Sequence, residues 1–113
     1  MILSAFLFYG LMFSHDGSTV DRLFEAISKT ENCRKWNNPG CLKYAKQEGA
    51  KRGHRGYAVF KTVELGSAAL MRRIEKYRGQ KVGTFLKKYN PGVRGYVSKV
   101  LHNSDGLTVS DVI

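Results

Sequence analysis

Glu31 is the residue of this chain best placed to act as an acid. It follows residues 19–30, in which Leu23, Phe24 and Ile27 recur at helical spacing, so a helix is expected there. A carboxyl at the C-terminal end of a helix meets the negative end of the helix dipole, which disfavours its charged form and raises its pKa. If this carboxyl is buried or half-buried, it is expected to keep its proton, as general acid catalysis requires. A solvated carboxylate at the helix end is the structural alternative.

The elements expected after this helix are a hairpin and three further helices. Strands are predicted at residues 42–44 and 57–60, separated by an exposed loop over residues 47–56 that is rich in Gly, Lys and Arg. A helix capped by Thr62 and ended by Gly79 follows, and two more are expected over about residues 84–89 and 94–102. The predicted fold class is α+β, mainly helical, with one small β-hairpin after the first domain helix.

The first 13 residues, MILSAFLFYGLMF, carry no charge. This run is shorter than the about 20 apolar residues that a spanning helix needs. Three interpretations stay open: a short membrane anchor, an atypical signal segment, or an apolar helix packed on the domain. A break at residues 15–18, HDGS, separates residues 1–13 from the domain expected at residues 18–113.

The net charge is +10, and it is unevenly distributed. Residues 1–33 have two Lys or Arg against four carboxylates, residues 34–61 have eight against one, and residues 62–113 have nine against four. The basic field begins just after Glu31 and favours a polyanionic partner, which includes nucleic acid, anionic lipid and acidic cell wall.

The two cysteines, Cys33 and Cys41, are eight positions apart. A disulfide between them would close a small loop and contribute about 2–3 kcal/mol in an oxidising compartment. Two reduced thiols remain the alternative. No metal site or cofactor is predicted, because only His54 lies near the cysteine pair in sequence and no phosphate-binding glycine loop is present.

Two segments resemble the lysozyme and lytic transglycosylase superfamily. Residues 36–45 read WNNPGCLKYA and are similar to the NNPGNL stretch of small phage-associated lysozyme-like proteins, with Glu31 before it and YAVF at residues 57–60 after it. Residues 88–100 read KYNPGVRGYVSKV and are similar to the YNAG…Y-V…V end of lytic transglycosylases. Asn32 departs from the Ser that usually follows the glutamate in that family, and the Gly-Leu-Met-Gln hairpin motif is absent.

The resemblance implies a lysozyme-like catalytic domain that cleaves peptidoglycan glycan strands without a cofactor. Glu31 would act as acid and then as base, assisted by the acetamido group of the sugar, to yield a 1,6-anhydro product. Glu48, Glu64 and Glu75 are poorly placed as a second carboxylate, which favours a lytic transglycosylase over the alternative, a muramidase hydrolase.

Six residues are expected to bind substrate. Tyr89, Asn90 and Tyr96 match cleft residues of the family, and Tyr96 is expected to hydrogen-bond the Glu31 carboxyl. The complete set is Asn38, Tyr44, Tyr57, Tyr89, Asn90 and Tyr96. Structural alternatives stay open: core packing for Tyr89 and Tyr96, turn formation for Asn38, and hairpin packing for Tyr44 and Tyr57.

Two other functions compete with the enzyme. Arg52 and Arg55 near Tyr44 and Tyr57 mix cations with aromatic rings, as single-strand nucleic-acid binders do. The basic residues are scattered over many elements, however, so nucleic acid is not favoured. The other rival is a non-catalytic wall-binding or structural phage protein. The expected location is a phage virion, or the bacterial periplasm or inner membrane facing the wall, with possible membrane attachment through residues 1–13.

Overall fold

The computed structural model describes residues 18–113, so the apolar segment at residues 1–13 lies outside the described part of the chain. Within residues 18–113, four α-helices and one two-stranded antiparallel sheet form an α+β fold. This agrees with the predicted fold class of α+β. The elements are α2 (Thr19–Glu31), η1 (Arg34–Trp36), β1 (Ala50–Arg52), η2 (His54–Gly56), β2 (Ala58–Phe60), α3 (Val63–Glu75), α4 (Val82–Tyr89) and α5 (Tyr96–His102).

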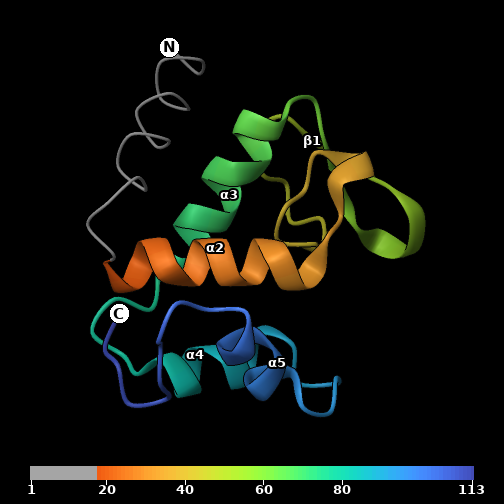
Figure 1. Cartoon of the computed structure of the whole chain (residues 1–113). Helices are drawn as coiled ribbons and strands as arrows, with labels where there is room; N and C mark the ends of the chain where they lie inside the picture. The colour runs from red at the N-terminus through yellow and green to blue at the C-terminus, as the bar shows by residue number, and fades with distance from the viewer. Residues whose placement is uncertain (1–17) are drawn as a thin grey trace.

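Helix α2 is the central element of the fold. It lies between α3 with the sheet on one side and α4 with α5 on the other (Figure 1). The helix begins where the Ser18 hydroxyl accepts a hydrogen bond from the Asp21 backbone N–H at 3.1 Å, and it ends at Asn32, which has a left-handed φ of 53°. These two caps confirm the predicted helix and set Glu31 in its last turn.

The main core gathers apolar side chains from all four helices. Those that are fully buried include Leu23 and Ile27 of α2, Leu70 and Ile74 of α3, and Phe85 of α4. A smaller cluster of Ala58, Phe60 and Ala69 lies under the sheet. The position of α2 against both groups of helices therefore depends on burial along its apolar stripe.

The hairpin differs from the sequence prediction. β1 pairs with β2 in the register Ala50↔Phe60, so the first strand falls within the segment predicted to be a loop. The predicted strand at residues 42–44 is wrong: this segment makes one isolated bridge, Lys43↔Tyr57. Within residues 18–113, only two backbone bonds join this segment to the hairpin, from Tyr44 N–H to the Gly56 carbonyl and from Ala58 N–H to the Leu42 carbonyl. The left-handed φ values of Cys41 and Lys46, 48° and 60°, turn the chain on either side of the bridge, so the ladder does not extend.

The last two helices begin at slightly different residues from those predicted. α4 begins at Val82 rather than at residue 84, because Lys81 is extended and its carbonyl already accepts the Phe85 N–H at 3.1 Å. α5 begins at Tyr96 rather than at residue 94, because Gly95 has a φ of 75° that a helix does not accept. Both shifts leave Tyr89 and Tyr96 at the facing ends of α4 and α5.

The segment after α2 packs closely on α3. A Cβ on Gly66 of α3 would collide with the Asn37 carbonyl oxygen, so only glycine permits this approach. The Asn37 side-chain amide donates to the Phe60 carbonyl at 3.0 Å, which joins the same segment to β2. Residues 18–113 contain no helix with the length and apolar character that a bilayer crossing demands.

Candidate active site

The Glu31 carboxylate is held by side chains from the far end of the chain. The Tyr96 hydroxyl at the start of α5 donates a hydrogen bond to Glu31 Oε2 at 2.5 Å. Asn90, the residue that caps the end of α4, has its side chain near enough to the carboxylate to favour the charged form. The resemblance predicted this meeting of Glu31 with the residues 88–100 segment, and the structure brings them into contact.

The surroundings of Glu31 favour its protonated form. Burial raises the pKa of the Glu31 carboxyl above its ordinary value of 4.5. The hydrogen bond from Tyr96, the nearby Asn90 side chain and the positive charge of Lys99 lower the pKa but only partly offset the burial. Burial and the neighbouring Glu31 raise the pKa of the Tyr96 hydroxyl, which favours its neutral form as the hydrogen-bond donor.

Tyr89 fixes the other side of the site. Its hydroxyl donates to the Gly40 carbonyl at 2.6 Å, and its ring lies parallel to that of Tyr96 with 6.1 Å between ring centroids. A Cβ on Gly40 would approach the Tyr89 hydroxyl oxygen to 2.6 Å and a Leu70 methyl to 2.9 Å. Glycine at position 40 is therefore required for the loop to reach α4.

A disulfide closes the loop beside Glu31. Cys33 and Cys41 are bonded, with Cα atoms 5.4 Å apart, which decides between the two alternatives left open by the sequence. The Cys41 sulfur lies 3.3 Å from the Glu31 backbone oxygen. The bond therefore holds the loop against the end of α2 and keeps Gly40 within reach of Tyr89.

A pocket of about 250 Å³ opens at Glu31 between the loop segment and α4. Of the predicted site residues, Glu31, Tyr57, Tyr89 and Asn90 line it, while Tyr96 lies behind Glu31 and is only 4% exposed. Tyr96 therefore orients the acid instead of facing the pocket. The full lining is Glu31, Cys41, Leu42, Lys43, Ala45, Gln47, Tyr57, Arg73, Tyr89 and Asn90.

Two predicted substrate-binding residues lie elsewhere. Asn38 is 0% exposed, and its amide donates to the Leu42 and Ala58 carbonyls at 3.0 and 2.9 Å while its oxygen accepts the Leu42 N–H at 2.9 Å. It fastens the loop to β2 and has no surface to offer a ligand, so the prediction of substrate contact is corrected. Tyr44 packs beside the small cluster, with Arg52 over its ring at 5.3 Å, and does not line the pocket.

The pocket wall also contains three residues that were not among the predicted site residues: Arg73, Lys43 and Gln47. Arg73 follows Ala69 by four residues and Leu70 by three, so helical spacing places it on the buried face of α3. A charged residue on the buried face of a helix is unusual, so this position of Arg73 could have indicated a functional residue from the sequence. Lys43 and Gln47 gave no signal, because their loop has no periodicity.

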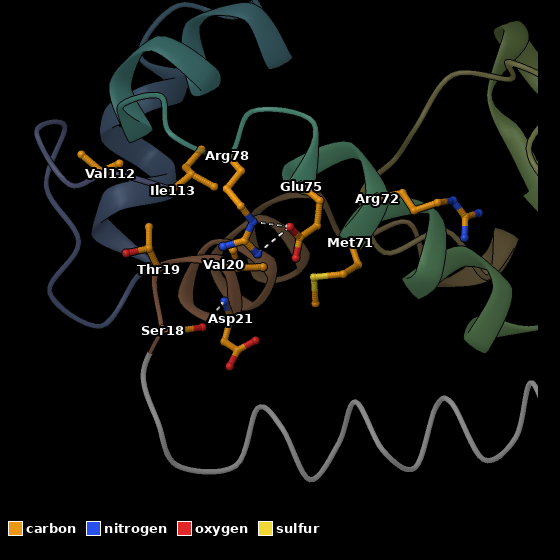
Figure 2. Close-up of a pocket in the computed structure, with 10 residues that line it drawn as sticks. All are labelled: Ser18, Thr19, Val20, Asp21, Met71, Arg72, Glu75, Arg78, Val112 and Ile113. Carbon is orange, nitrogen blue, oxygen red and sulfur yellow. Dashed lines mark hydrogen bonds and ion pairs between the residues drawn. The ribbon is translucent and has the colours of Figure 1, made fainter.

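A second pocket, of about 430 Å³, lies at the opposite end of α2 (Figure 2). It contains residues from the start of α2, the end of α3 and the C-terminus. Glu75 in this pocket is exposed and pairs with Arg78 at 2.5 Å. The Glu75 carboxylate is open to solvent and held by Arg78, so this pocket offers no sheltered acid like that of Glu31.

Replacing Tyr96 with Phe is expected to lower activity about 10-fold and to change its pH dependence, because an imprecisely placed acid transfers its proton less well. The substitution removes a hydrogen bond that stabilises the carboxylate, so the Glu31 pKa rises further. Since the protonated form is the acid, the activity loss on the alkaline side should move to higher pH. Rate against pH measures this, with Tyr44→Phe as the control; an unmoved profile would contradict the assigned role of Tyr96.

Taken together, the described residues define an α+β domain with a half-buried glutamate in a pocket. Comparison with known proteins adds no identity, since no family model, no curated protein and no solved structure matches the chain.

Proposed function

We propose that this protein cleaves the glycosidic bond between N-acetylmuramic acid and N-acetylglucosamine in peptidoglycan, as a lytic transglycosylase of lysozyme-like fold. One observation carries the proposal: Glu31 is half-buried in a pocket, with a raised pKa, and is oriented by the hydrogen bond from Tyr96. Breaking a glycosidic bond requires a carboxylic acid that is still protonated when substrate is bound and is aimed at the leaving oxygen.

The reaction divides into two proton transfers at the same side chain. The Glu31 carboxyl gives its proton to the glycosidic oxygen as the bond from that oxygen to C1 of muramic acid breaks. The acetamido oxygen of the same sugar stabilises the positive charge that develops at C1. The Glu31 carboxylate then takes the proton of the sugar's O6 hydroxyl as O6 bonds to C1, which closes the anhydro ring and restores the acid.

The composition of the pocket favours this route over hydrolysis. Glu31 is the only carboxylic acid among the described residues that line it. Glycosidases that use water generally have a second carboxylate about 5–10 Å from the first. Assistance by the sugar's own acetamido group removes that need.

Aromatic and cationic groups beside Glu31 suit an acidic sugar polymer. The Tyr57 ring stacks on Trp36 with centroids 5.2 Å apart, and Lys43 Nζ lies 4.0 Å from the Tyr57 centroid. The Tyr57 ring supplies apolar surface in the pocket wall, and the excess of positive charge draws a polyanionic strand toward the pocket. The disulfide favours an oxidising site of action such as the periplasm, and the resemblance favours delivery by a phage particle.

The test is mass analysis of the fragments released from purified peptidoglycan. Fragments ending in 1,6-anhydro-muramic acid are expected, and they must be absent with Glu31→Gln. Reducing ends would overturn the transglycosylase assignment in favour of a muramidase hydrolase. Salt-sensitive DNA retention without fragment release would contradict the enzyme altogether.

A further inference from the structure

Arg73 is a cation in the pocket wall, and the described part of the chain supplies it with no counter-ion. It projects from α3, is half-buried, and places its guanidinium carbon 5.7 Å from the centroid of the Tyr89 ring. Its Nε is out of contact with solvent and has no hydrogen-bond partner. Within residues 18–113, Arg73 makes no ion pair with any carboxylate.

An unpaired, half-buried guanidinium attracts anions strongly. Partial removal from water weakens solvent screening, so the charge acts at lower effective dielectric than on the open surface. Glu31 does not neutralise it when protonated, and Lys43 adds a second positive charge at the pocket edge. The other buried guanidinium nitrogen without a partner in the described chain, that of Arg22, belongs to α2 and not to this pocket.

We propose that Arg73 binds a carboxylate of the substrate and so makes the site selective for carboxylate-bearing muropeptide strands over neutral chitin-type oligomers. This inference rests on the proposed function. A guanidinium matches a carboxylate through two parallel N–H···O bonds, which supplies geometry as well as charge. Stacking on Tyr89 limits the motion of the Arg73 side chain, so less freedom is lost on binding.

The test compares binding of two oligomers to the Glu31→Gln protein, which binds without turnover. Calorimetry with a peptide-bearing muropeptide tetrasaccharide and with chitotetraose gives both affinities. Arg73→Gln in this background is expected to weaken muropeptide binding about 10-fold and to leave chitotetraose binding unchanged, since only the muropeptide carries a carboxylate that the guanidinium can bind. Arg73→Lys should restore part of the difference, and Arg72→Gln, next to it on α3 but outside the pocket, should change neither affinity.

The outcomes separate this inference from the proposed function. Equal weakening for both oligomers, or no change for either, overturns the role of Arg73 while leaving glycan cleavage intact. If the Arg73→Gln protein does not fold, the test uses the Glu31→Gln protein that retains Arg73. This protein must bind the muropeptide more tightly than chitotetraose at low salt, and the difference in affinity must decrease as added salt screens the charge of Arg73. Absence of binding to both oligomers, together with no fragment release by the unsubstituted protein, would overturn the proposed function itself.

Discussion

Replacing Glu31 with Gln is expected to abolish peptidoglycan cleavage, with a loss of at least about 10³-fold, while the domain stays folded. The amide has nearly the same shape as the carboxyl, and its oxygen still accepts the hydrogen bond from the Tyr96 hydroxyl. It cannot release a proton to the leaving oxygen or take one from O6. Turbidity loss of isolated cell walls measures activity, and circular dichroism measures folding.

The matched control for that variant is Glu25→Gln. Glu25 lies on the same helix but is exposed, and it is remote from the pocket lining. Its substitution makes the same change from carboxyl to amide on the same helix and is expected to leave cleavage unchanged. Equal loss of activity in Glu25→Gln and Glu31→Gln would contradict a role that is specific to the Glu31 carboxyl.

Replacing Asn38 with Ala is expected to lower the free energy of unfolding by about 3 kcal/mol or more. The substitution removes the hydrogen-bond partner of the Ala58 carbonyl and of the Leu42 N–H, while the Leu42 carbonyl keeps its bond from the Ala58 N–H. Each buried polar group left unpaired costs about 1–3 kcal/mol, and water has little access to this fully buried site. Urea denaturation of the oxidised protein gives the change directly.

The same variant separates a structural role from a binding role. If Asn38 only fastens the loop, the variant assayed below its melting temperature should keep a KM close to that of the unsubstituted protein. A normal stability together with a raised KM would mean that Asn38 contacts the sugar, contrary to its burial.

Local chemistry explains which parts of the fold were predictable. The Ser18 cap and the apolar stripe of residues 19–30 act within one helix, so α2 was predicted nearly to the residue. The strand pairing of β1 was not, because Ala50–Arg52 has no apolar alternation and owes its place to the register with β2.

The site was predicted unevenly for a similar reason. The prediction that Tyr89, Asn90 and Tyr96 lie near Glu31 came from the resemblance. Periodicity within one sequence cannot show which distant segments come together. The burial of Asn38 and the exposure of Arg73 to the pocket depend on partners 20 or more residues away, such as the Ala58 carbonyl. The local sequence around Asn38 or Arg73 does not indicate which distant residues they contact.

The proposed acid chemistry depends on one carboxyl group remaining protonated to a higher pH than a solvated glutamate. An NMR titration of the Glu31 side-chain carboxyl carbon measures that property without substrate. A titration midpoint clearly above 4.5 is the expected result. A midpoint at or below 4.5 would show a carboxylate that has already lost its proton, and would contradict the assignment of Glu31 as the acid.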